Sequence, residues 1–429
     1  MMSSLLWTSL FAAALMGSFA TRAWLSTRQI RHVARHRGAV PASFAAAMPL
    51  AAHQKAADYT LARARLGQWQ MAFGAVVLLG WTLFGGLDAL NVAVRDATET
   101  RWGGLAYGVA LITAFTVVGS VLELPFDLYS TFRLEQRFGF NRVTWRLWLA
   151  DAAKSLGLGI VVGMPLLALM LWIMGAAGRL WWLGAWAAWM AIVLVAQVLV
   201  PTWIAPLFNR FEELKDVSLA ERIRALMARA GLAASGLFVM DGSRRSAHAN
   251  AYFTGFGKAR RVVFFDTLLA RLAPAEVEAV LAHELGHFKL RHVTKRIAAM
   301  AALTLAFFAL LGWLSTRTWF FTGLGVDPNL GAPNDALALL LMLLMAPVFT
   351  VFATPFFSRW SRRDEFEADA YACAEASGSD LASALLKLHE DNASTLTPDP
   401  IYARFYYSHP PAVERLAALT RQASIATAS

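Results

Sequence analysis

Residues 283–287 have the sequence His-Glu-Leu-Gly-His, the part of this chain with the clearest chemical meaning. On a helix, positions i and i+4 share a face, so His283 and His287 would point at the same spot. Two neutral imidazoles at this spacing form half of a tetrahedral zinc site, with the carboxylate of Glu284 beside them. The motif predicts one zinc ion per chain and peptide hydrolysis, with Glu284 as general base. The alternative is a chance match on an amphipathic helix.

The residues around the motif predict the helix that positions it. Pro274 suits a first helical turn, and 275–282 contains good helix formers and apolar-face residues. His292 would lie on a different face of a continuous helix, and we interpret it as a structural or interfacial residue. The single cysteine, Cys373, excludes an intramolecular disulfide and a cysteine-based zinc site. Any further metal ligand must therefore be His, Asp or Glu.

A catalytic zinc ion needs a third protein ligand and one open position. The best source is the acidic segment 361–369, whose apolar continuation predicts a helix. Glu365 and Asp369 are four residues apart and share a face, whereas Glu367 points nearly the opposite way. We predict that Glu365 is the third ligand and that Asp369 orients a ligating imidazole. The alternative is a solvated acidic helix start that satisfies the helix dipole.

The composition is that of a polytopic membrane protein. Of the 429 residues 57% are hydrophobic and 16% are charged, and the mean hydropathy is +0.47. Soluble proteins contain about 25% charged residues. The net charge of +10 comes from basic residues beside apolar stretches, which favours cytoplasmic topology anchors against anionic lipid. We expect membrane lipid as a partner and no nucleic acid.

Seven stretches are long and apolar enough to cross the membrane as helices, at 4–24, 69–94, 104–125, 155–178, 180–205, 297–316 and 335–357. The loops 25–68 and 126–154 are rich in Lys and Arg, and the alternate loops are poor in them. Basic loops stay in the cytoplasm, so the N-terminus is expected outside and the C-terminus inside. The Ala-rich composition, with Arg favoured over Lys, indicates a bacterial inner membrane with a periplasmic N-terminus.

We predict four parts along the chain. Residues 1–205 contain five membrane helices with basic cytoplasmic loops, and 206–296 form a cytoplasmic catalytic segment with the histidine motif. Residues 297–357 contain the last two membrane helices, and 358–429 form a cytoplasmic C-terminal segment with the third zinc ligand. The second part combines a helical stretch with β-like runs, which predicts a small α+β unit; these elements lie at 219–230, 237–240 and 261–265.

The sequence resembles the type I CAAX prenyl proteases, a family of integral-membrane zinc endopeptidases. The motifs that carry the resemblance lie at 124–126, 138–141, 201–209, 241–246, 248–253, 283–287, 361–369 and 407–411. H-E-x-x-H is common to many zinc peptidases. The Asn-Ala-Tyr segment at 250–252, the E-F-x-A-D segment at 365–369 and the His-Pro-Pro segment at 409–411 are together far more specific.

The resemblance implies a predominantly α-helical fold. Seven transmembrane helices would enclose an intramembrane chamber, with a small zincin-like α+β catalytic part on the cytoplasmic side. It also implies that zinc is bound by His283, His287 and Glu365, with Glu284 as general base.

On the substrate side, the resemblance implies that His409 and Arg415 contact the substrate near the scissile bond. Asn250, Ala251 and Tyr252 would present a strand edge on which an extended peptide pairs by main-chain hydrogen bonds. Taken from the residues alone, His409 is equally well a turn residue before two prolines, and Arg415 a solvated helix residue.

The predicted function is peptide-bond hydrolysis by a membrane-embedded zinc metalloendopeptidase. The resemblance implies C-terminal CAAX processing, the removal of three residues from a peptide or protein that could be prenylated. One alternative is a zinc protease that clears damaged membrane proteins. Another is a non-catalytic transporter or scaffold with a structural zinc site. A structural site would want a fourth protein ligand, and no unassigned residue is an obvious candidate.

Overall fold

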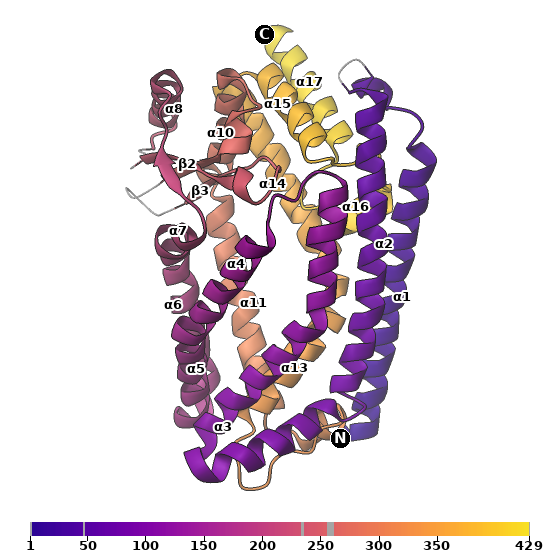
Figure 1. Cartoon of the computed structure of the whole chain (residues 1–429), viewed down its shortest axis with the longest axis vertical. Coiled ribbons are helices and arrows are strands. Elements are labelled where there is room, and N and C mark those ends of the chain that lie inside the picture. The colour runs from indigo at the N-terminus through magenta and orange to yellow at the C-terminus, as the bar shows by residue number, and fades with distance from the viewer. Residues whose placement is uncertain (1, 46–47, 233–235, 255–260, 429) are drawn as a thin grey trace.

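The computed structural model describes residues 2–45, 48–232, 236–254 and 261–428. Long helices form most of the molecule, and a small sheet lies at one end of it (Figure 1). The C-terminus lies at the end with the sheet, and the N-terminus lies at the opposite end. We call the end with the sheet the catalytic end.

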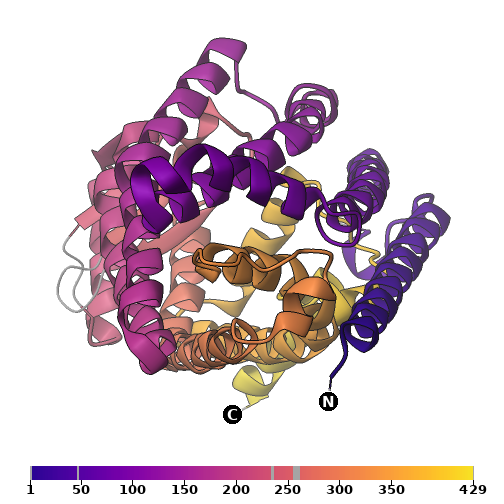
Figure 2. The same ribbon diagram turned by 90° about the horizontal axis from the view of Figure 1, so that it is seen from below.

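Six helical runs in the described part of the chain are long and apolar enough to cross a membrane. They are α1 (Ser4–His36), α3 (Gly86–Tyr129), α4 (Trp145–Leu158) with α5 (Met164–Ala176), α6 (Trp181–Leu199) with α7 (Ala205–Phe208), α11 (His292–Leu314), and α13 (Asp335–Thr350) with α14 (Thr354–Glu375). With α2 (Leu50–Trp81) they form a ring when viewed from below (Figure 2). The expected helical, polytopic membrane fold is confirmed.

The predicted span at 69–94 has the wrong bounds. α2 ends at Trp81 and α3 begins at Gly86, and the chain turns between them at Gly85, where φ is 74°. Glycine adopts this left-handed conformation without steric cost. The apolar composition continues through the turn, so hydropathy alone gives no sign of it. The first half of α2 carries Lys55, Arg63 and Arg65, which leaves an apolar stretch shorter than a full span.

The catalytic end contains a four-stranded sheet in the order β1-β2-β4-β3. The strands are β1 (Phe211–Glu213), β2 (Gly236–Met240), β3 (Ala251–Thr254) and β4 (Arg261–Phe265). β2 and β4 are parallel, and β3 is antiparallel to β4 and forms one edge of the sheet. The predicted β-like runs are confirmed as β2 and β4, and the predicted helical stretch as α8 (Val217–Arg229).

Helix α10 (Pro274–Lys289) carries the histidine motif and begins at the predicted proline. The Glu276 carboxylate accepts a hydrogen bond of 2.7 Å from the Ala273 amide and so caps its first turn. Val277, Leu281 and Leu285 bury one face of the helix in a core shared with α8 and the sheet. The other short helices are α9 (Asp266–Leu269), α12 (Thr318–Thr322), α15 (Gly378–Asp391), α16 (Pro400–Tyr406) and α17 (Ala412–Ala428).

Helix α14 joins the membrane part of the chain to the catalytic end. It begins at Thr354 and continues to Glu375, so it crosses the predicted boundary at 357/358 without a break. One rigid helix therefore fixes the height of the acidic segment relative to the membrane helices. The four-part division of the chain stays a prediction.

Candidate metal centre and active site

Three side chains from two distant helices converge at the catalytic end. His283 and His287 come from α10 and Glu365 comes from α14, and one potential ligand atom of each lies within 4.8 Å of the others. The two Nε2 atoms are 3.3 Å apart. Glu365 Oε2 is 3.4 Å from Nε2 of His283, and Glu365 Oε1 is 3.2 Å from Nε2 of His287. Ligand atoms bound tetrahedrally at zinc distances are about 3.3 Å apart, so the three spacings match.

Burial and charge also fit a metal ion at this position. The Glu365 side chain is only 3% exposed, and its Oε2 atom has no hydrogen-bond partner among the described residues. Leaving a buried carboxylate oxygen without a partner is costly, and a cation would satisfy it. Two imidazoles and one carboxylate are a donor set used by catalytic zinc sites, which keep the fourth position open.

Asp369 and Arg415 hold the first imidazole in place. Asp369 Oδ1 lies 2.8 Å from Nδ1 of His283, which leaves Nε2 of that ring facing Glu365. Arg415 donates from Nε to the other Asp369 oxygen at 2.8 Å, and both side chains are buried. Burial alone would lower the pKa of His283, but the neighbouring carboxylates of Asp369 and Glu365 raise the pKa to about 9. A metal ion must therefore displace a proton from this ring.

His292 contacts the second histidine of the motif, although a continuous helix would place it on a different face. Its Nδ1 atom is 3.0 Å from Nδ1 of His287, and its Nε2 atom is 3.1 Å from Glu367 Oε2. α10 ends at Lys289, and Arg291 has φ of 60°, so the chain turns before α11 starts at His292. A non-glycine residue in this conformation gives no sequence signal. His292 and Glu367 thus support the second imidazole.

Gly286 lets α10 and α14 approach closely enough to form the site. A Cβ atom at this position would lie 3.0 Å from the Ala368 Cα, 3.1 Å from the Ala368 carbonyl oxygen and 3.2 Å from the Tyr371 Cβ. Two of these neighbours are backbone atoms of α14, so they can yield only if that helix moves. Movement of α14 would carry Glu365 away from the histidines.

We expect Gly286→Ala to weaken metal binding about ten- to hundredfold, the range found when the surroundings of metal ligands are changed. Competition with a chelator of known affinity measures this in purified protein. Gly119→Ala on α3 is the matched control, because a Cβ there would meet no described atom within 4 Å. Unchanged metal affinity in the Gly286 variant would contradict this account of the helix contact.

Glu284 lies next to the edge strand of the sheet. It lines a small pocket together with Ala251, Tyr252 and Phe253 of β3. Asn250 directly precedes the strand and is exposed. The structure therefore brings the predicted general base and two of the predicted substrate-binding residues to one place. Within the described part of the sheet, β3 has a neighbour on one side only.

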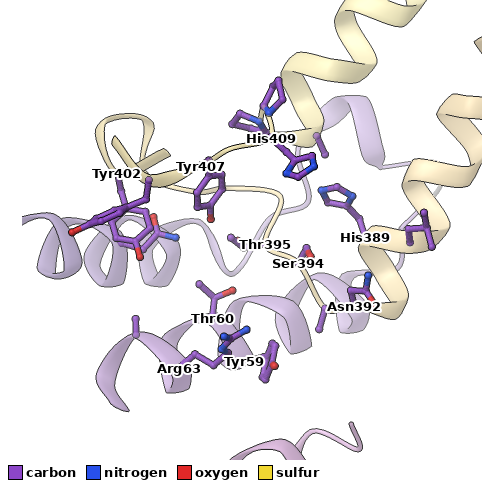
Figure 3. Close-up of a pocket in the computed structure, with 18 of the residues that line it drawn as sticks. Tyr59, Thr60, Arg63, His389, Asn392, Ser394, Thr395, Tyr402, Tyr407 and His409 are labelled. Atoms are coloured by element: carbon purple, nitrogen blue, oxygen red, sulfur yellow. The ribbon is translucent and has the colours of Figure 1, made fainter. Parts of the chain in front are cut away.

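His409 approaches the three converging side chains from the loop between α16 and α17. Its Nε2 atom is 3.4 Å from Glu365 Oε1, and its side chain is 64% exposed. Arg362 of α14 fixes the loop by donating to the Tyr407 carbonyl at 2.7 Å. His409 lines a cavity of about 920 Å³ with Asn250 and Arg415 (Figure 3). Arg415 lines this cavity while its guanidinium is engaged by Asp369.

Comparison with known proteins places this chain in one family over most of its length. Residues 29–210 match the family described as CAAX prenyl protease N-terminal, five membrane helices, and residues 213–423 match peptidase family M48. The CAAX prenyl protease 1 homolog of Mus musculus is 30% identical, over 96% of this chain and 95% of that protein. CAAX prenyl protease 1 of Saccharomyces cerevisiae is 34% identical, over 73% of this chain and 72% of that protein.

A solved structure agrees with these matches. The crystal structure of S. mikatae Ste24p has a TM-score of 0.89 and 28% sequence identity, and the match covers 96% of this chain and 99% of that one. The likeness thus extends over the membrane helices and the catalytic end alike. The chain belongs to the type I CAAX prenyl protease family of M48 peptidases, and it is a membrane-embedded metalloendopeptidase.

Proposed function

We propose that the metal is a single zinc ion held by His283, His287 and Glu365. The observation that carries this proposal is the set of ligand spacings of 3.2, 3.3 and 3.4 Å, which suits tetrahedral zinc. The absence of a cysteine ligand and the use of imidazole nitrogen agree with zinc among the metals that peptidases use. Bound zinc supplies a Lewis acid that acidifies water and polarises a carbonyl group.

The protein side chains have separate roles in the proposed reaction. Glu284 takes the proton from the attacking water and passes it to the leaving amine. Asp369 accepts the Nδ1 proton of His283 and so fixes its tautomer and orientation. His409 faces the cavity beside Glu365, where it can donate a hydrogen bond to the carbonyl oxygen that gains negative charge.

The substrate binds as an extended strand on β3. Main-chain groups alternate along an edge strand, so Ala251 faces the open edge while Asn250 and Tyr252 face β4, where the Asn250 carbonyl accepts from the Phe265 amide at 3.0 Å. A peptide would hydrogen-bond to the main chain of Ala251 irrespective of its side chains, in place of the 2.8 Å bond from the Ala251 amide to Asn250 Oδ1, while the side chains of Asn250 and Tyr252 flank it. Glu284 lines a small pocket with residues of β3, so a peptide paired with β3 would have its scissile bond near the proposed general base. Arg415 is engaged by Asp369, so its predicted contact with the substrate uses the part of the side chain that lines the cavity.

The substrate class follows from the names of the relatives, which are CAAX prenyl proteases. We propose that the enzyme removes the last three residues of a C-terminal C-a-a-X motif. The cysteine before the scissile bond could carry a prenyl group.

The catalytic end is proposed to face the cytoplasm. Both basic loops lie at this end, since Asn141 of one forms a β-bridge to Ser246 and Arg63 of the other lines the cavity beside His409. Basic loops are retained in the cytoplasm, where anionic lipid rather than nucleic acid is their expected partner. The prediction that this membrane is a bacterial inner membrane rests on composition alone, and the eukaryotic relatives named above give that prediction no support.

Metal removal from detergent-purified protein tests this function. Chelation is expected to abolish cleavage of a farnesylated C-terminal peptide, and one equivalent of zinc per chain to restore it. An unmodified peptide of the same sequence is expected to be cleaved more slowly. Equal rates on the two peptides would remove lipid recognition from the proposal. Failure of the zinc-loaded protein to cleave either peptide would contradict the proposal that a CAAX peptide is its substrate.

A further inference from the structure

The cavity beside His409 carries positive charge without any acidic residue. It lies between α1, α2 and the C-terminal helices, and its volume of about 920 Å³ is large enough for a short peptide. Arg22, Arg63 and Arg415 line it, and no Asp or Glu occurs among its described lining residues. A cavity of this kind suits an anionic group of a ligand, and arginine matches a carboxylate in both charge and shape.

Arg63 is the arginine best placed to bind such a group. Arg415 is engaged by Asp369, and Arg28 on α1 and Arg37 directly after it are paired with Asp399 and Asp58 at 2.9 and 2.7 Å. In contrast, neither Arg63 nor Arg22 has a carboxylate oxygen within 4.0 Å in the part of the chain that the structure describes.

The neighbours of Arg63 hold it in position without neutralising it. Its guanidinium carbon lies 5.6 Å from the centre of the Tyr59 ring, and the Tyr59 hydroxyl donates to Glu135 at 2.6 Å. A cation–π contact of this kind restrains the side chain, and the ring carries no charge that would neutralise the guanidinium. Arg63 and Tyr59 lie across the pocket from His409 (Figure 3).

The direction of β3 determines which part of a substrate enters this cavity. β3 runs from Ala251 to Thr254, so a peptide that pairs antiparallel to it leaves the strand at the Asn250 end. Ala249 and Asn250 line the cavity, together with His409. The residues that follow the scissile bond therefore enter the acid-free cavity. Three extended residues reach about 10 Å, which limits how far the chain end can lie from the scissile bond.

We propose that Arg63, assisted by Arg22, binds the free α-carboxylate at the C-terminus of the substrate. This inference rests on the proposed function and deepens it. The enzyme then selects chains that end a few residues after the scissile bond, because only they place their terminal charge at Arg63. Such a subsite would let an endopeptidase select chain ends without contacting particular side chains of the substrate.

Two farnesylated peptides of identical sequence test the proposal with the zinc-loaded full chain in detergent. One ends in a free carboxylate and the other in a carboxamide. Wild-type protein is expected to cleave the free acid with kcat/KM about ten- to hundredfold higher, the effect of one hydrogen-bonded charge. Arg63→Gln should bring this ratio close to one. Arg65→Gln is the matched control, because Arg65 is exposed on α2 and does not line the cavity, and it should keep the wild-type ratio.

The outcomes separate this inference from the function on which it rests. Cleavage of both peptides at equal rates by wild-type protein would overturn the carboxylate subsite and leave the protease function intact. An unchanged preference for the free acid in Arg63→Gln would also overturn it, as would the same loss of preference in Arg65→Gln. If wild-type protein cleaved neither peptide, the proposed function and this inference would fail together.

Discussion

Glu284→Gln is expected to lower kcat by about a thousandfold or more while the metal stays bound. The amide keeps the size of the side chain but cannot take a proton from water, and general-base catalysis contributes about 10²–10⁴ in rate. The substitution leaves the proposed metal ligands untouched, because His283, His287 and Glu365 contact one another without Glu284. Metal analysis of the purified variant, together with a peptide-cleavage assay, measures both properties in the same sample.

Glu278→Gln is the control for this experiment. Glu278 lies on the same helix but accepts hydrogen bonds from Arg222 at 2.8 and 3.0 Å, away from the histidines. The control should keep its metal and nearly all of its activity, since a pair at the surface contributes little. Full activity of Glu284→Gln would contradict its assignment as general base, and loss of the metal would show that the side chain has a structural role.

The sequence predicted the parts of the site that depend on local geometry. His283 and His287 share a face because any α-helix places residues i and i+4 together, and Pro274 marked where that helix begins. The same rule predicted that Glu365 and Asp369 point the same way from α14, and the structure places both against His283. The relative direction of side chains that are separated by whole turns of one helix can be predicted without knowing the fold.

Sequence reasoning failed where the backbone turns or where distant elements meet. The left-handed conformation of Arg291 brings His292 back to His287, although a continuous helix would have separated them. The turn at Gly85 likewise divides an apolar run that hydropathy treats as one span. The positions of Arg63 and Arg22 beside His409 depend on the packing of three separate helices and one loop. Patterns along the chain cannot specify such contacts, since they depend on the whole fold.

Glu365→Gln is expected to weaken zinc binding at least a hundredfold and to abolish cleavage with it. Glu365 supplies the only negative charge among the three proposed ligands, so its loss leaves two neutral imidazoles to hold a doubly charged ion. The position is buried, and Arg415 Nη1 lies only 3.8 Å from Glu365 Oε2. Without the carboxylate, the metal would face a nearby cation in a site with little water to screen it.

Zinc affinity, measured by competition with a chelator, distinguishes this effect from a loss of folding. The metal-free variant should elute like wild type in detergent, because glutamine keeps the volume of the glutamate side chain and α14 stays anchored by its contact with α10 at Gly286. Glu375→Gln is the matched control, because Glu375 lies near the end of the same helix, ten residues beyond the proposed ligand, and should leave affinity unchanged. Retained zinc affinity in a folded Glu365→Gln protein would contradict the third ligand. In that case Glu365 would act only as an ion-pair partner of the two histidines, and the close approach of α14 to α10 would serve stability rather than metal binding.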